Sequence, residues 1–196
     1  MGRPASRRPF NDLHRSLFQF MRGRMPAIGA AILMIAPVCL FIAAISDLFT
    51  MTIPNRVSIF LLASFAVLAP VSGLPWAEIS MSVAAGALVL AVCFGFFALN
   101  IMGGGDVKLL AASAVWFGFS PALGAFIVAT ALWGGVVTLL VLLLRAQANR
   151  FAVIETVVPA QILATKKIPY GVAIGIAGIM TFWDSPIALA ALKMLG

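Results

Sequence analysis

Long apolar runs, separated by short polar or turn-rich segments, dominate the chain from residue 27 onward. The runs cover residues 27–45, 57–71, 81–99, 109–119, 122–144 and 168–183. Several of them approach or reach the roughly 18–20 residues that a helix needs to cross the hydrocarbon core of a bilayer. Lipid cannot satisfy open backbone groups, and no run shows strand alternation. The pattern therefore predicts an all-α integral membrane protein with about six transmembrane helices in one bundle.

Composition agrees with this class and excludes others. Hydrophobic residues make up 63% of the 196 residues, and the net charge is +7. In a membrane protein such basic residues anchor helix ends beside anionic lipid, so we expect the bilayer as a partner and no nucleic acid. Cys39 and Cys93 lie far apart inside apolar runs, and His14 is the only histidine. We therefore expect no metal site and no cofactor.

A basic tail precedes the apolar runs. Residues 1–25 hold six arginines, and we separate them from residues 26–196, which we predict to be one polytopic membrane domain. The segments expected on the side of the candidate site hold six basic residues as well, so the positive-inside rule does not decide the orientation. Two interpretations stay open for the tail: it lies at the membrane interface, or the native start is Met21 or Met25.

The order of the crossings assigns the acidic residues to sides of the membrane. With six crossings, Asp47, Asp106 and Glu155 share one side, and Glu78 and Asp184 lie on the other. Asp47 and Asp106 adjoin the ends of apolar runs, where an ionisable group is costly and a functional role is the default hypothesis. Two nearby carboxylates can share one proton, so that one of them activates water, as in aspartic proteases. The alternative is that both aspartates cap helices.

Three short motifs resemble those of type IV prepilin peptidases. Asp47 is followed at residues 53–55 by Ile-Pro-Asn, and residues 103–108 read Gly-Gly-Gly-Asp-Val-Lys, similar to the GxGD motif of that family. Residues 168–171, Ile-Pro-Tyr-Gly, resemble the start of its last helix. Larger members carry a cytoplasmic insertion with two CxxC pairs. This sequence has no such insertion, so it resembles the small, peptidase-only form associated with tight-adherence (Flp-type) pili.

The resemblance implies an aspartic endopeptidase of the bacterial inner membrane. It would remove the leader of type IV or Flp-type prepilins or of pseudopilins at the cytoplasmic face, without N-methylation, in contact with pilus assembly machinery. Asp47 and Asp106 would be the catalytic pair. The expected substrate-binding or supporting residues are Gly103, Gly105, Lys108, Pro54 and Asn55. For Lys108 an interface anchor is an alternative, and Pro54 with Asn55 would fix the start of a helix.

Tyr170 lines the cleft on one interpretation and belongs to an interfacial aromatic belt on another. Two functions of other classes also stay open for the whole chain. One is a non-enzymatic carrier whose aspartates bind protons or cations, although a carrier more naturally buries acidic groups in mid-span. The other is an inactive structural subunit of a pilus or secretion assembly.

Overall fold

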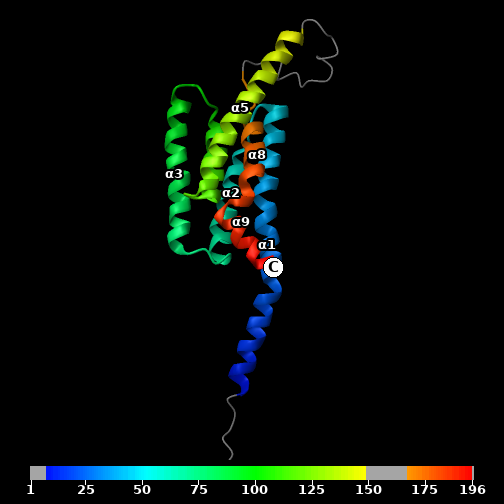
Figure 1. Ribbon diagram of the computed structural model, residues 1–196, viewed down its shortest axis with the longest axis vertical. Helices are drawn as coiled ribbons and strands as arrows, with labels where there is room; N and C mark the ends of the chain where they lie inside the picture. Colours follow the sequence, from blue (N-terminus) through cyan, green and yellow to red (C-terminus); the bar gives the residue numbers. More distant parts are fainter. Residues whose placement is uncertain (1–7, 149–166, 196) are drawn as a thin grey trace, which may run out of the picture.

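The computed structural model of the chain describes residues 8–148 and 167–195, and within these ranges it is helical with no strand (Figure 1). The first part forms α1 (Arg8–Thr50), α2 (Asn55–Val71), α3 (Trp76–Ala98), α4 (Gly104–Phe117) and α5 (Pro121–Ala148). The second part forms α8 (Tyr170–Thr181), the short 3-10 helix η1 (Phe182–Asp184) and α9 (Pro186–Leu195). The predicted all-α class is confirmed.

The length and hydropathy of each helix determine whether it can cross a membrane. Three described helices are long and apolar enough: Met25–Thr50 of α1, all of α3, and Pro121–Gln147 of α5. A fourth results if the pair Tyr170–Asp184 and Pro186–Leu195, bent by 55°, counts as one span. α2 has 17 residues and α4 has 14, which at about 1.5 Å per residue is short of the ~30 Å core. The described helices thus confirm the apolar spans but not the count of six.

Two predicted boundaries can be compared with the observed ones. α1 begins at Arg8 and runs without a break across residues 25 and 26, with Pro26 and Pro37 inside it. The division into a tail and a membrane domain therefore stays a prediction. α4 begins at Gly104, five residues before the start that the apolar run indicates, and ends at the predicted turn, where Gly118 has a φ of +58°.

α4 is the central helix of the bundle. Eleven of its 14 residues are buried, and it packs mainly against α3 and α2. Trp116 donates a buried hydrogen bond of 3.0 Å from Nε1 to the carbonyl of Leu61, and Phe117 stacks on Phe126 of α5 with ring centroids 4.6 Å apart. A helix that is apolar around its whole circumference is expected to be buried. Its first turn is consequently held by packing on several sides.

α8 lies close against α1, with α5 on another side. A Cβ at Gly175 would lie 2.9 Å from the carbonyl oxygen of Leu40, and one at Gly178 would lie 2.6 Å from Leu40 Cδ1. Small residues allow membrane helices to approach each other this closely. The packing brings the start of α8 beside the C-terminal end of α1, at the upper end of the bundle (Figure 1).

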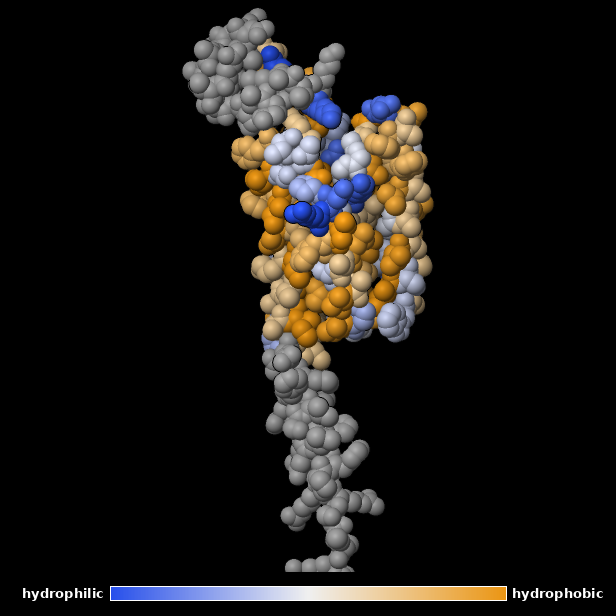
Figure 2. All heavy atoms as spheres, turned by 180° about the vertical axis from the view of Figure 1, so that it is seen from behind, coloured by the Kyte–Doolittle hydropathy of each residue, from blue (hydrophilic) through white to orange (hydrophobic). Residues whose placement is uncertain are grey.

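The outer surface is apolar over most of the height of the bundle. Figure 2 shows a largely hydrophobic face on which hydrophilic residues gather in the upper part. This is the end at which α1 and α3 finish and α4 and α8 begin (Figure 1). The N-terminal part of α1 extends from the opposite end.

The packing of α3 on α4 can be tested at Gly86. A side chain there would collide with Val115, and its Cβ would lie 3.1 Å from the carbonyl oxygen of Ala111. We expect Gly86→Leu to lower the stability by about 1–3 kcal/mol, as overpacking does, measured as a lower melting temperature in detergent. Gly95→Leu on the same helix is the control, because no described atom lies within 4 Å of a Cβ there. Equal losses in both variants would contradict the packing.

Candidate active site

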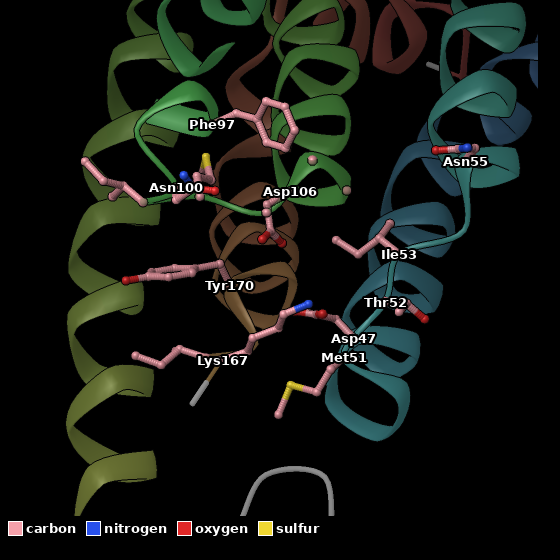
Figure 3. A pocket seen from close by; sticks show the side chains of 16 residues that line it. Asp47, Met51, Thr52, Ile53, Asn55, Phe97, Asn100, Asp106, Lys167 and Tyr170 are labelled. Carbon is pink, nitrogen blue, oxygen red and sulfur yellow. The ribbon is translucent and has the colours of Figure 1, made fainter. Parts of the chain in front are cut away.

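Three segments enclose a cavity of about 670 Å³ at the end of the bundle that is uppermost in Figure 1, and Figure 3 shows this cavity from close by. The first is the end of α1 with the link to α2, the second is the loop between α3 and α4, and the third is the segment that leads into α8. Asp47, Gly103, Gly105, Asp106 and Tyr170 are among the lining residues. The cavity therefore unites the three motifs that the sequence singles out.

Asp47 is held in place by the first turn of α8. Its side chain is 5% exposed, and Oδ2 accepts a 2.7 Å hydrogen bond from the backbone N–H of Gly171. A Cβ at Gly171 would lie 2.8 Å from both Cβ and Oδ2 of Asp47, so glycine is required for this contact. Asp47 thus accepts a hydrogen bond from a backbone N–H in the first turn of α8, as the capping alternative expects.

Asp106 lies in the first turn of α4, where backbone N–H groups have no partner within the helix. The N-cap residue is Gly103, so Asp106 is not itself the cap. Its carboxylate is buried, and Oδ1 has no hydrogen-bond partner among the described residues. A Cβ at Gly103 would lie 2.8 Å from Oδ2. An unpaired buried oxygen is costly and calls for an explanation, and it leaves Asp106 with capacity to bind a water or a substrate group.

The two carboxylates face the same cavity and are near enough to repel each other when both are charged. Lys167 lines the cavity as well (Figure 3), and its positive charge attracts the Asp106 carboxylate. Such a pair can hold one proton between two carboxyl groups, which is the state required for acid–base chemistry on a peptide bond. In the part of the chain that the structure describes, no three His, Cys, Asp or Glu side chains are grouped as metal ligands.

Ile53 lies between the glycine beside Asp106 and the glycine beside the Asp47 carboxylate. A Cβ at Gly105, next to Asp106, would lie 3.2 Å from Ile53 Cβ, and a Cβ at Gly171, next to the Asp47 carboxylate, would lie 2.8 Å from Ile53 Cδ1. The side chain of Ile53 is buried. One residue of the Ile-Pro-Asn motif therefore contacts the glycine that adjoins each aspartate, and it sets the spacing between α4 and α8.

The five predicted supporting residues have different positions. Gly103, Gly105 and Asn55 line the cavity. Pro54 is the N-cap residue of α2, with a φ of −62° and an extended ψ, and it directly precedes the first helical residue, Asn55. Lys108 lies outside the cavity lining and donates a 3.0 Å hydrogen bond from Nζ to Asn55 Oδ1. It therefore links α4 to the start of α2.

The motifs alone do not identify several residues that shape the site. Met51 and Asn100 both line the cavity and have positive φ values of 53° and 57°, a conformation that is uncommon for residues other than glycine. Lys167 and Gly171 lie beside or within the Ile-Pro-Tyr-Gly motif, which was the signal that could have identified them. Tyr170 lines the cavity, in agreement with one of its two interpretations.

The remaining acidic residues lie elsewhere. Glu78 is in the first turn of α3, whose opposite end contributes Phe97 to the cavity, and Asp184 ends η1 beyond α8. The sequence predicts that both lie on the other side of the membrane from Asp47 and Asp106. In the structure, Glu78 is at the end of α3 that is remote from the cavity, and Asp184 follows the end of α8 that is remote from the cavity. Glu155 lies outside the described residues.

Apolar helices and two buried aspartates on one cavity define the class as a helical membrane protein with a carboxylate-pair site. The sequence profile of the type IV leader peptidase family matches residues 34–139. This is just over half of the chain and includes both aspartates, and the chain belongs to this family. Membership supports a leader-peptidase type of function, and hence a hydrolase. No curated protein and no solved structure gave a match.

Cysteine labelling in oriented vesicles can test whether the three motifs lie at the same end of the bundle. We expect Asn100→Cys and Lys167→Cys to react with a membrane-impermeant maleimide from the same side, because both residues are exposed at the cavity. Trp76→Cys, which is 75% exposed at the start of α3, should react from the other side. Cys39 and Cys93 are buried and are replaced with alanine beforehand. Labelling of Asn100→Cys and Lys167→Cys from opposite sides would refute the arrangement.

Proposed function

We propose that the chain is a membrane aspartic endopeptidase that removes the leader of type IV or Flp-type prepilins or of pseudopilins. Asp47 and Asp106 are its catalytic pair, and it needs no cofactor and does not methylate the product. It acts at the cytoplasmic face of the bacterial inner membrane, together with pilus assembly machinery. In this proposal α1, α2, α3, α4, α5 and the α8–α9 pair provide the six crossings, and the cavity opens toward the cytoplasm.

One observation carries the proposal. Two buried carboxylates from segments 59 residues apart in the sequence line one cavity, in a chain of the type IV leader peptidase family. A carrier would more naturally place such groups in mid-span, whereas these lie at the end of α1 and at the start of α4. The unpaired Oδ1 of Asp106 supports a role in which that oxygen binds a reacting group.

The proposed mechanism uses one proton shared by the pair. The ionised carboxylate removes a proton from water while the water oxygen attacks the scissile carbonyl carbon, and the protonated carboxyl donates a hydrogen bond to the carbonyl oxygen. The C–N bond of the resulting tetrahedral intermediate then breaks as a proton moves to the leaving nitrogen. The products are the leader with a new carboxylate and the mature subunit with a new amine. Gly171 keeps Asp47 aligned through its N–H during these steps.

Removing either carboxylate tests the catalytic pair. We expect Asp47→Asn and Asp106→Asn each to lower the rate of leader release by more than about 10³-fold. When two residues act as a unit, removal of either one abolishes most of the activity that they have together. The measurement is the appearance of the mature protein from full-length prepilin in detergent, followed by mass spectrometry.

Asp184→Asn is the matched control, because this exposed carboxylate lies at the opposite end of the bundle. It should cleave at the rate of the unmodified protein. Near-normal cleavage by Asp106→Asn would exclude the mechanism. A properly folded protein that leaves prepilin intact would favour the carrier or the structural subunit.

Gly171→Ala tests whether the position of Asp47 matters, apart from its chemistry. The added Cβ would lie 2.8 Å from Asp47 Oδ2, so the carboxylate must move, and a displacement of about 1 Å costs on the order of 10²-fold in rate. Gly175→Ala is the control: it crowds the same interface, 2.9 Å from the carbonyl oxygen of Leu40, without touching the aspartate. Both variants should lose stability, and only Gly171→Ala should lose turnover per folded molecule. Equal turnover in the two would contradict the positioning role.

A further inference from the structure

A long apolar groove runs between α3 and α5, and we name it the α3–α5 groove. Its volume is about 640 Å³, and Leu110 of α4 is part of its lining. On α5 it extends from Ile127 to Leu142, a rise of about 22 Å at ~1.5 Å per residue. Among the described residues that line it, none is charged. The groove is thus long enough for several turns of an apolar helix.

The groove adjoins the cavity that holds the two aspartates. Met102 and Tyr170 line both spaces. Tyr170 projects from α8 toward α5 (Figure 3), and a Cβ at Gly134 of α5 would lie 3.4 Å from its ring. These two side chains form the boundary at which a chain would pass from the groove into the cavity.

The α5 wall of the groove has the composition of a helix-packing surface. Thr130, Gly134 and Thr138 follow each other at four-residue spacing, and Ala131 and Gly135 repeat the pattern on the adjacent row. Small residues at this spacing allow two membrane helices to approach closely. Thr138 donates its hydroxyl to the carbonyl of Gly134 at 2.7 Å.

We propose that the α3–α5 groove binds the apolar helix of the prepilin substrate and directs the N-terminal end of that helix to Asp47 and Asp106. This inference rests on the proposed function. In that function the bond to be cut lies between a polar leader at the aqueous edge and an apolar helix in the bilayer. A helix lying along α5 in the groove meets the cavity at Met102 and Tyr170, so its leader reaches the carboxylates.

Two other apolar crevices fit this role less well. The crevice between α2 and α3, about 430 Å³, adjoins the cavity only through Asn55, whose amide oxygen is occupied by the ammonium of Lys108. The crevice between α1 and α2 shares no described lining residue with the cavity. The α3–α5 groove joins the cavity through two side chains, neither of which is charged.

Blocking the groove tests the proposal. No described atom lies within 4 Å of a Cβ at Gly135, so Gly135→Trp has room and fills the groove. We expect cleavage of full-length prepilin, measured as kcat/KM, to fall by about tenfold or more, the equivalent of losing one helix contact of 1–2 kcal/mol. Gly124→Trp is the matched control on α5, because its Cβ is equally open and it lies outside the groove. Ala87→Trp fills the α2–α3 crevice instead. Both controls should cleave normally.

Photo-crosslinking gives a readout independent of turnover. In the Asp106→Asn protein, which keeps the substrate uncut, benzoylphenylalanine at position 135 should crosslink to the apolar helix of prepilin, and at position 124 it should not. Normal cleavage by Gly135→Trp, or crosslinks from position 135 to lipid alone, would overturn the groove while leaving the peptidase function intact. Failure of the unmodified protein to cut prepilin would overturn the function and, with it, this inference.

Discussion

The hydrogen bond between Gly171 N–H and Asp47 Oδ2 joins residues 124 positions apart, and the geometry of the site depends on it. The donor is available only because the backbone of α8 lies against α1, and a Cβ at Gly171 would lie 2.8 Å from the acceptor. Gly175 and Gly178 extend the close approach along α8. In a membrane, where apolar surfaces have no preference for one another over lipid, such close packing supplies much of the association energy. The position of Asp47 is thus a consequence of helix packing and not of a local turn.

The second aspartate is positioned by a different part of the bundle. Asp106 lies in the first turn of α4, which is buried among α2, α3 and the C-terminal helices. Ile53 lies between the start of α4 and the start of α8 and fixes the distance between them, since it contacts both Gly105 and Gly171. Burying two carboxylates is costly when nothing compensates for their lost hydration. Here Gly171 hydrogen-bonds one of them and Lys167 lies near the other. Both carboxylates line the cavity at the end of the bundle, each held by a different set of helices.

Hydropathy predicted the helical class and most helix positions, and the parity of the crossings predicted that Asp47 and Asp106 share one end. α4 starts five residues before the apolar run that begins at residue 109, because burial by three neighbouring helices makes residues 104–108 helical although only Val107 among them is apolar. The contact between Gly171 and Asp47 leaves no hydropathy signal, since it depends on the absence of a side chain. The hydrogen bond from Lys108 to Asn55 could not be predicted either, because Lys108 alone is consistent with an interface anchor and Asn55 with the start of a helix. Local patterns predict elements, whereas these contacts depend on pairs distant in sequence.

Of the two interpretations of Tyr170 in the sequence, the structure supports the one in which it lines the cleft. The residue lines the polar cavity and the apolar groove at once, and a phenol ring with one polar end suits a boundary between water and lipid. A peptidase that cuts beside an apolar helix needs such a boundary, because the cut bond requires water and the helix requires lipid or protein. A carboxylate pair in mid-span would satisfy the helix but exclude the water. The placement of Asp47 and Asp106 at helix ends, next to a groove that runs along α5, satisfies both requirements.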